Sequence, residues 1–176
     1  PIPVYAEMSS VNPVVLFPGA IAKDPKALAA GFVASLTLGA GQFCTNPGLI
    51  LIPVDAPSIT EAIITALGEL TGQTMLSSGI FDAYNEGNKR LRASGAELIA
   101  TGAAGPTLNS PAPTIYRTNA AHLRANVDLQ DEVFGSSALL VTYVDLDDLK
   151  ATLEALQGQL TCTVHAVESD YPQVAA

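Results

Sequence analysis

The spacing of apolar residues predicts a chain in which strands alternate with helices. Continuous apolar runs rich in aliphatic and β-branched residues are typical of buried strands, and they occur at 14–17, 49–54, 96–101, 113–117, 137–144 and 160–167. Apolar residues at helical spacing predict helices at 26–38, 57–71, 80–94 and 145–156, with a further helix starting at Tyr171. Strands of this kind, separated by helices of about 12 to 16 residues, indicate an α/β fold with three α/β/α layers and a largely parallel open sheet.

Residues with strong local preferences predict where several helices begin and end. Asp24 precedes a first-turn proline and is predicted to cap its helix, and Ser58 with Glu61 resembles a capping box. Gly95 is predicted to end the helix before it, and the Gly-, Pro-, Ser- and Asn-rich stretch 102–112 is predicted to be a connecting loop. In a sheet of this class, functional groups are expected in the loops that leave the carboxyl ends of the strands.

The length of the chain fits one folded domain, and its apolar composition suggests that part of its surface packs against another domain or copy. A chain of 176 residues lies within the usual size of a single domain. With 48% hydrophobic and 14% charged residues, it is too apolar for a disordered chain. We therefore expect a large apolar face that packs against another domain or copy, and that promotes self-association when it is left open.

The net charge limits the classes of molecule that the chain is expected to bind, and the cysteine content indicates the redox state of its compartment. The net charge of −9 disfavours nucleic acids and anionic membranes, because both select for clustered Lys and Arg and the chain has only eight such residues. The two cysteines, Cys44 and Cys162, form neither a secreted disulfide framework nor a metal-type cluster. Gly or Pro interrupts every long apolar run before it reaches about 18 residues, so no membrane-spanning segment is predicted. These features favour a reduced, cytoplasmic setting.

The segment Gly41-Gln42-Phe43-Cys44-Thr45-Asn46-Pro47-Gly48 is the strongest chemical signal in the chain. Gly39 and Gly41 stop the preceding helix and Pro47-Gly48 turns the chain into the next strand, so Cys44 is expected on a tight turn between two elements. A turn of this kind can present a nucleophilic thiolate. The alternative is a small buried core cysteine, which is a common environment for this residue type.

Three segments of the chain together resemble the aldehyde dehydrogenase superfamily. Gly41-Gln42-Phe43-Cys44 is similar to the family's cysteine signature, and Ala6-Glu7-Met8-Ser9-Ser10-Val11-Asn12-Pro13, a few dozen residues earlier, is similar to its glutamate motif. Asp131-Glu132-Val133-Phe134-Gly135 resembles a later motif of the form Glu-x-Phe-Gly-Pro. Each pattern alone is weak, but the three occur in the family's order and spacing over nearly the whole chain.

The resemblance implies a site and a mechanism. It implies that Cys44 is the nucleophile, which forms a thiohemiacetal and then a thioester with an aldehyde, and that Glu7 is the general base that activates the hydrolytic water. It implies that Glu132 accepts hydrogen bonds from the nicotinamide ribose of NAD or NADP, and that Phe134 packs near the nicotinamide ring. The other interpretations are an ordinary exposed glutamate near the chain end for Glu7, a solvated carboxylate for Glu132 and a core residue for Phe134.

Two departures from the family motifs affect the expected subgroup and cofactor. Ser9-Ser10-Val11 stands where Gly-Gly-Lys is usual, and Ser136 replaces the proline that ends the third motif. The form Glu-Met-Ser-Ser is similar to the subgroup that acts on α-ketoglutaric semialdehyde and long-chain aldehydes, often with NADP, so NADP is slightly favoured over NAD. The first departure is therefore interpreted as a subgroup marker.

The resemblance also implies that residues 1–176 are the cysteine-bearing catalytic domain of a longer protein. The chain begins at Pro1, close to Glu7, whereas family members place a dinucleotide-binding domain before this motif and an oligomerisation tail after the region that ends here. The expected partners are the missing cofactor-binding domain, an aldehyde substrate and, in the full-length protein, further copies in a homo-oligomer. The alternative is an isolated, redox-silent fragment with at most cysteine-dependent esterase activity, or an association module.

His122 and His165 raise a second enzymatic hypothesis, a cysteine-histidine hydrolase in which an imidazole activates Cys44. No local motif connects either histidine with the cysteine, since His165 lies in a predicted strand and His122 in a polar turn or short helix. No spacing of His, Cys, Asp or Glu resembles a ligand set, so no metal is predicted.

Overall fold

A computed structural model describes residues 2–4 and 8–175, and it confirms the three-layer α/β class. Within these residues one sheet has six strands in the order β3-β4-β5-β2-β1-β6. The strands are β1 Val14–Leu16, β2 Leu49–Pro53, β3 Glu97–Thr101, β4 Thr114–Asn119, β5 Ser137–Tyr143 and β6 Thr163–His165. All neighbouring pairs are parallel except β3 with β4, which is antiparallel at one edge.

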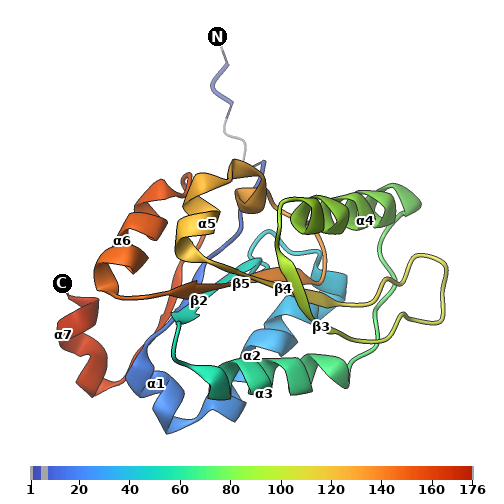
Figure 1. The fold of residues 1–176 in the computed structure, drawn as a ribbon. Helices are drawn as coiled ribbons and strands as arrows, with labels where there is room; N and C mark the ends of the chain where they lie inside the picture. The colour runs from blue at the N-terminus through green and yellow to red at the C-terminus, as the bar shows by residue number, and fades with distance from the viewer. Residues whose placement is uncertain (1, 5–7, 176) are drawn as a thin grey trace.

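Helices cover both faces of the sheet (Figure 1). The lower layer in that view holds α1 Pro18–Lys23, α2 Pro25–Thr37 and α3 Pro57–Gly68, and the upper layer holds α4 Ser78–Ala93, α5 Ala120–Ala125 and α6 Leu146–Ala155. Shorter elements are the 3-10 turns η1 Leu38–Gly41, η2 Val127–Gln130 and η3 Glu168–Asp170, and the helix α7 Tyr171–Val174. Among the helices of the described residues, none is both long and apolar enough to span a lipid bilayer.

The central strand β2 shows why its sequence is apolar at every position. Ile50 and Ile52 pack into the core on the α2 and α3 side, whereas Leu49 and Leu51 pack into the core on the α4, α5 and α6 side. Successive side chains of a strand point to opposite faces, so a strand covered on both faces must be apolar throughout.

Most predicted element ends agree with the structure, and two do not. The Asp24 carboxylate caps α2 by accepting from the N–H of Ala27, and Gly95 follows α4 with a left-handed φ of 85°. The predicted capping box was wrong: Ala56 is the N-cap of α3, which has no side-chain cap, because the helix already begins at Pro57 and Ser58 lies inside it. Strand β6 is also shorter than predicted, and its three residues are exposed at the sheet edge.

Helix α1 was not predicted, because Pro18-Gly19 suggests a turn. Its first N–H groups are held from a distant part of the chain: Asp170 accepts from the N–H of Gly19 at 2.8 Å and from that of Ala20 at 3.0 Å. The Asp170 carboxylate is buried and also accepts from the N–H of Val167 at 2.9 Å. This side chain therefore joins α1 to the segment that follows β6.

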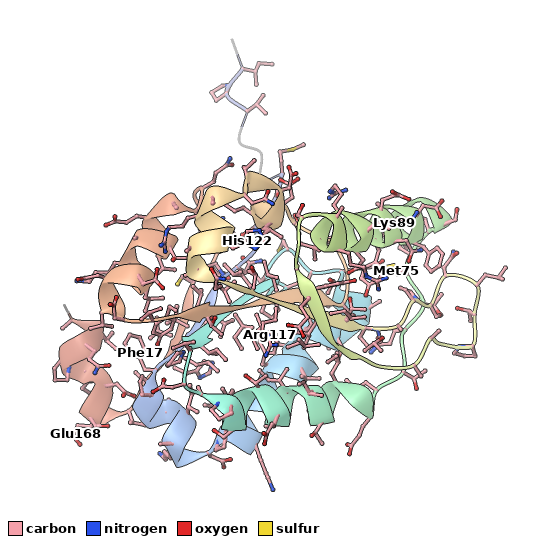
Figure 2. All side chains as sticks on the ribbon, viewed as in Figure 1. Phe17, Met75, Lys89, Arg117, His122 and Glu168 are labelled. Atoms are coloured by element: carbon pink, nitrogen blue, oxygen red, sulfur yellow. The ribbon has the colours of Figure 1, made fainter. Side chains whose placement is uncertain are left out.

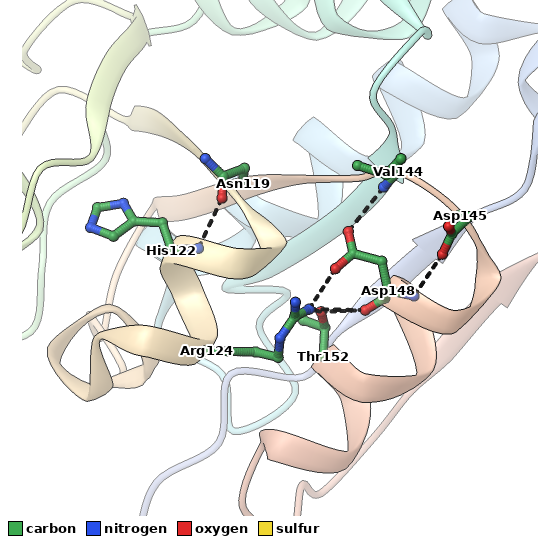
Figure 3. Close-up of polar contacts among 7 residues, drawn as sticks. All are labelled: Asn119, His122, Arg124, Val144, Asp145, Asp148 and Thr152. Atoms are coloured by element: carbon green, nitrogen blue, oxygen red, sulfur yellow. Dashed lines mark hydrogen bonds and ion pairs between the residues drawn. The ribbon is translucent and has the colours of Figure 1, made fainter.

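Helices α5 and α6 are joined by a partly buried ion pair (Figure 3). The guanidinium of Arg124 donates to the Asp148 carboxylate at 2.7 Å and to the hydroxyl of Thr152 at 2.6 Å. The second oxygen of Asp148 accepts from the N–H of Val144 at 3.0 Å. Burial by itself raises the pKa of Asp148, but the Val144 N–H and the Arg124 guanidinium together outweigh it and hold the pKa below its usual value.

This ion pair predicts acid-sensitive stability. A carboxyl group whose pKa is lower in the folded state stabilises the fold fully above its unfolded pKa, about 3.9 for aspartate, and loses that contribution as pH falls through the folded value. Asp148→Asn is therefore expected to lower the free energy of unfolding by about 1 to 2 kcal/mol at pH 7, and the difference from wild type should shrink below about pH 4. Urea titrations at pH 7, 4 and 3 measure it. Thr152→Val is the control, because its cost should not depend on pH; a pH-independent cost for Asp148→Asn would contradict the prediction.

Candidate active site

The segments that resembled family motifs all lie at the amino ends of the parallel strands. Residues 8–13 lead into β1, 42–48 into β2 and 131–136 into β5. This differs from the expectation that functional groups would lie at the carboxyl ends. The reason is local, because each motif directly precedes its strand in the sequence.

Cys44 lies on a turn that reverses the chain after α2. Three consecutive residues, Gly39, Ala40 and Gly41, have left-handed φ values of 56°, 60° and 69°. Beyond them, the N–H of Asn46 donates to the carbonyl of Phe43 at 3.0 Å and closes the turn. Cys44 is exposed at this turn, so the alternative of a buried core cysteine was wrong.

Two glutamines fasten this reversal to the segment between α3 and α4. Gln73 donates through Nε2 to the carbonyl of Thr37 at 3.1 Å, and its Oε1 accepts from the N–H of Ala40 at 3.3 Å. In return, Oε1 of Gln42 accepts from the N–H of Leu76 at 3.0 Å. The left-handed stretch is therefore held at residues before, within and after it by this one segment.

Asn12 fastens the cysteine turn to the segment that precedes β1. Its Nδ2 donates to the carbonyl oxygens of Cys44 and Asn46, each at 2.9 Å. Its Oδ1 accepts from the hydroxyl of Ser10 at 2.8 Å and from the N–H and hydroxyl of Thr161 at 3.2 and 3.0 Å. Asn12 is only 2% exposed and has a φ of 45°, a conformation that Asn tolerates better than most residues.

The third motif lies directly against the first two. A Cβ placed on Gly41 would lie 2.2 Å from the carbonyl carbon of Gly135, so the two backbones touch with no side chain between them. The N–H of Ser10 donates to Oε2 of Glu132 at 3.3 Å. All three segments thus meet at one place on the amino edge of the sheet.

Within the third motif, side chains alternate between the core and the surface. Val133 packs against the core beside Gly87 of α4, whereas Phe134 is 38% exposed and Glu132 is half-buried. The alternative of a core position for Phe134 was therefore wrong. Its exposed ring and the Glu132 carboxylate are both available to a ligand at this edge.

Tyr84 of α4 forms a fixed wall behind the third motif. A Cβ on Gly135 would lie 2.5 Å from the Tyr84 ring and 2.6 Å from Met75, which Figure 2 shows beside α4. The Tyr84 hydroxyl donates to the carbonyl of Ala112 at 2.8 Å. Burial raises its pKa to about 12, so the phenol stays neutral and remains a donor at physiological pH.

The general base predicted at Glu7 lies outside the described residues, so its role stays a prediction. The residues that follow it are described: Ser9 is exposed, and Ser10 is buried and contacts Glu132 and Asn12. The glutamate motif therefore enters the site at the same edge as Cys44.

The two histidines lie away from the cysteine turn. His122 is in α5, beyond the carboxyl end of β4, where Nδ1 contacts the Thr118 hydroxyl at 2.9 Å (Figure 2). His165 ends β6 at the carboxyl edge, whereas Cys44 precedes β2 at the amino edge. This arrangement does not support a cysteine-histidine hydrolase. Among the described residues, no three His, Cys, Asp or Glu side chains gather as a metal site would require.

The second cysteine has a different environment. Cys162 is exposed as a residue, but partial desolvation of its sulfur raises the pKa of the thiol. It follows Thr161, which is bonded to Asn12, so it lies on the far side of that asparagine from Cys44.

A largely apolar groove of about 560 Å³ adjoins the cysteine turn. It runs between α2 and β6, with Thr45 and Pro47 at one end and Lys23 at the other. Phe32 and Val164 contribute to its walls. The groove begins at the residue after Cys44 and is therefore a concave space next to the candidate nucleophile.

Sequence reasoning missed the polar residues that hold the site together. Gln159 is the clearest case: its Oε1 accepts from the N–H groups of Val11 and Asn12 at 2.7 and 3.2 Å and from the Ser10 hydroxyl at 3.0 Å. It lies about 150 positions from them in the sequence, and no local pattern could connect them. For Asn12, the available signal was a polar residue two positions before a buried strand.

Comparison with known proteins assigns the family. No family model matches the chain. It is 46% identical over 176 residues to α-ketoglutaric semialdehyde dehydrogenase 2 of Azospirillum brasilense, covering 98% of this chain and 33% of that protein. It is 40% identical over 179 residues to α-ketoglutaric semialdehyde dehydrogenase of Acinetobacter baylyi, covering 98% and 34%. The chain thus spans about a third of the length of these relatives.

The fold agrees with these relatives. A crystal structure of an NAD-dependent aldehyde dehydrogenase from Sinorhizobium meliloti superposes with a TM-score of 0.79 at 19% identity, covering 96% of this chain and 35% of that one. At this identity the likeness shows the fold alone, and the family follows from the two sequence relatives together with the three motif segments that meet at Cys44. The chain belongs to the aldehyde dehydrogenase superfamily.

Proposed function

We propose that this chain is the cysteine-bearing catalytic domain of an NAD(P)-dependent enzyme that oxidises an aldehyde to a carboxylic acid. The observation that carries the proposal is the exposed Cys44 on a turn where the cysteine, glutamate and third motif segments meet. The names of the two relatives support an α-keto semialdehyde as the substrate class.

Cys44 would act as the nucleophile. Its thiolate adds to the aldehyde carbon and forms a tetrahedral thiohemiacetal, and loss of hydride from that carbon leaves a thioester. Water then attacks the thioester carbonyl, and collapse of the adduct releases the carboxylic acid and the Cys44 thiolate. Glu7 is proposed, by its place in the glutamate motif, to take the proton of that water.

The cysteine turn has donors for the oxyanion of each tetrahedral adduct. Within the described part of the chain, the backbone N–H groups of Cys44 and Thr45 donate no hydrogen bond to the protein. Backbone N–H groups fixed near a nucleophile stabilise negative charge that develops on the substrate oxygen. These two groups are therefore the proposed oxyanion donors from this chain.

Glu132 and Phe134 fit a nicotinamide nucleotide. Only Oε2 of Glu132 bonds to the described protein, through Ser10, which leaves the other oxygen for ribose hydroxyl groups. Phe134 is 38% exposed and can pack against a planar ring. When NAD or NADP is bound, its nicotinamide accepts the hydride.

The remaining parts of the enzyme are proposed to lie outside this domain. Its relatives are about three times as long as the segment matched here, which is ample for a cofactor-binding domain and a region for homo-oligomer formation. Exposed apolar residues beside the cysteine turn suit a domain that packs over it: Leu38, Phe43, Leu76 and Phe134.

Acylation by p-nitrophenyl acetate tests the nucleophile. We expect a burst of p-nitrophenolate and one acetyl group, which peptide mass spectrometry places on Cys44. Cys162→Ser is the matched control and should leave the burst unchanged, because desolvation raises the pKa of Cys162 and leaves little of it as thiolate at neutral pH. An acetyl group on Cys162 instead would overturn the assignment. A burst without NAD(P) reduction when an aldehyde is added would identify this chain as the redox-silent, esterase-like fragment.

A further inference from the structure

The side-chain amide of Asn12 forms hydrogen bonds to three other parts of the chain through both its nitrogen and its oxygen. Both hydrogens of Nδ2 go to the cysteine turn, one to the carbonyl of Cys44 and one to the carbonyl of Asn46, at 2.9 Å each. Its Oδ1 is held by Ser10 and Thr161. A planar amide fixed at both ends can neither rotate nor flip without breaking several bonds in a buried site.

These bonds fix the direction of two N–H groups. In a trans peptide unit, the C=O of one residue and the N–H of the next point in opposite directions. Because Asn12 draws the Cys44 carbonyl inward, the N–H of Thr45 must point outward. The Phe43 carbonyl is likewise engaged by the N–H of Asn46, so the N–H of Cys44 also points away from the turn's interior.

We propose that Asn12 is a positioning residue for the nucleophile. By holding the Cys44 carbonyl, its side-chain amide aims the N–H of Thr45 at the substrate oxygen. By holding the Asn46 carbonyl, it braces the turn whose Asn46-to-Phe43 bond directs the N–H of Cys44 to the same place. This role rests on the proposed function, because it matters only if Cys44 forms tetrahedral adducts. It differs from the roles implied for Glu7 and Glu132, since Asn12 is only 2% exposed and is proposed to act through the backbone of the cysteine turn.

Two variants remove the Asn12 donors in different ways. Asn12→Gly deletes the side chain and keeps a residue that tolerates the φ of 45°. Asn12→Asp keeps the shape and the acceptor toward Thr161 but presents oxygen, not N–H, to the Cys44 and Asn46 carbonyls. Thr161→Val removes one of the bonds to Asn12 Oδ1 and leaves both Nδ2 donors in place, so it measures the smaller effect of loosening the other end of the amide. Asp170→Asn is the control for general destabilisation, because its carboxylate caps α1 at the other edge of the sheet.

Comparing two reactions of Cys44 distinguishes misplaced N–H donors from general damage to the fold in the Asn12 variants. Acylation by p-nitrophenyl acetate passes through an oxyanion, whereas alkylation by iodoacetamide does not. In variants shown to be folded by circular dichroism, we expect Asn12→Gly and Asn12→Asp to slow acylation by about tenfold or more, with alkylation changed by less than about threefold. Asp170→Asn should leave the ratio of the two rates at its wild-type value, and Thr161→Val should change it less than either Asn12 variant does. Acylation at the wild-type rate in both Asn12 variants would overturn the proposal.

Hydrogen exchange of the peptide 42–48 gives a readout that does not depend on catalysis. Asn12→Gly should speed exchange of the Asn46 and Gly48 N–H groups by about tenfold, since two bonds that hold the turn are lost. If exchange changes but wild-type Cys44 is never acylated, the proposed function fails while the hold on the turn stands. If exchange and acylation are both unchanged, the positioning proposal alone fails.

Discussion

Replacing Cys44 by alanine is expected to abolish the acylation burst and to lower p-nitrophenyl acetate turnover by at least about 10³-fold. The thiolate is the group that forms the covalent bond, and within the described residues no other thiol lies on this turn with free N–H donors beside it. Stopped-flow absorbance measures the burst, and intact mass measures the adduct.

The free energy of unfolding distinguishes a Cys44 variant that has lost its nucleophile from one that has lost its fold. Cys44 is exposed, so Cys44→Ala should change the free energy of unfolding by less than about 0.5 kcal/mol. Cys44→Ser is the closest match in size and should also lose the burst, because a hydroxyl is a far weaker nucleophile than a thiolate at neutral pH. A full burst in either variant would show that the chemistry lies elsewhere.

Replacing Gly41 by alanine is expected to lower the free energy of unfolding by about 3 to 4 kcal/mol. Two costs add: Gly41 has a φ of 69°, and a Cβ there would lie 2.2 Å from the Gly135 carbonyl carbon and 2.4 Å from the Ser136 nitrogen. Backbone atoms cannot yield as a flexible side chain can, so one of the two segments must move. Urea unfolding monitored by circular dichroism measures the cost, and the folded fraction should acylate more slowly.

A glycine-to-alanine substitution at an open helix position should instead raise the free energy of unfolding. Gly31 lies on the exposed side of α2, and nothing lies within 4 Å of the Cβ that Gly31→Ala would add. Alanine favours a helix, so this variant should be more stable by about 0.5 to 1 kcal/mol. Equal effects of Gly31→Ala and Gly41→Ala would mean that the close contact with Gly135 is absent in solution.

The fold could be predicted from the sequence because strands that are covered on both faces of a sheet must be apolar at nearly every position, and such runs are visible in the sequence. Strands β2 and β5 are apolar along nearly their whole length, as strands buried on both faces must be. Helix α1 could not be predicted, because Asp170 stabilises its first turn from 150 residues away. Elements that depend on distant side chains carry no periodic signal.

The candidate site was predictable in part for the same reason. The glycines and proline around Cys44 act locally and correctly indicated a tight turn, whereas the exposure of Cys44 came from the structure. The contacts that hold this turn come from Asn12 and Gln73, each more than 30 residues away, and nothing in the local sequence indicates them. The family resemblance implied that the three motifs share one site, but it did not predict the hydrogen bonds and backbone contacts between them.

The backbone contact between Gly41 and Gly135 has a consequence for how ligands communicate. With no side chain between the two segments, a shift of one must displace the other. A nucleotide held by Glu132 and Phe134 would therefore alter the affinity of Cys44 for a reversible aldehyde adduct, and that adduct would alter nucleotide affinity by the same factor, because linkage between two binding equilibria is reciprocal. The absence of a Cβ at Gly41 and at Gly135 is what places the two segments in direct backbone contact and so couples the two sites.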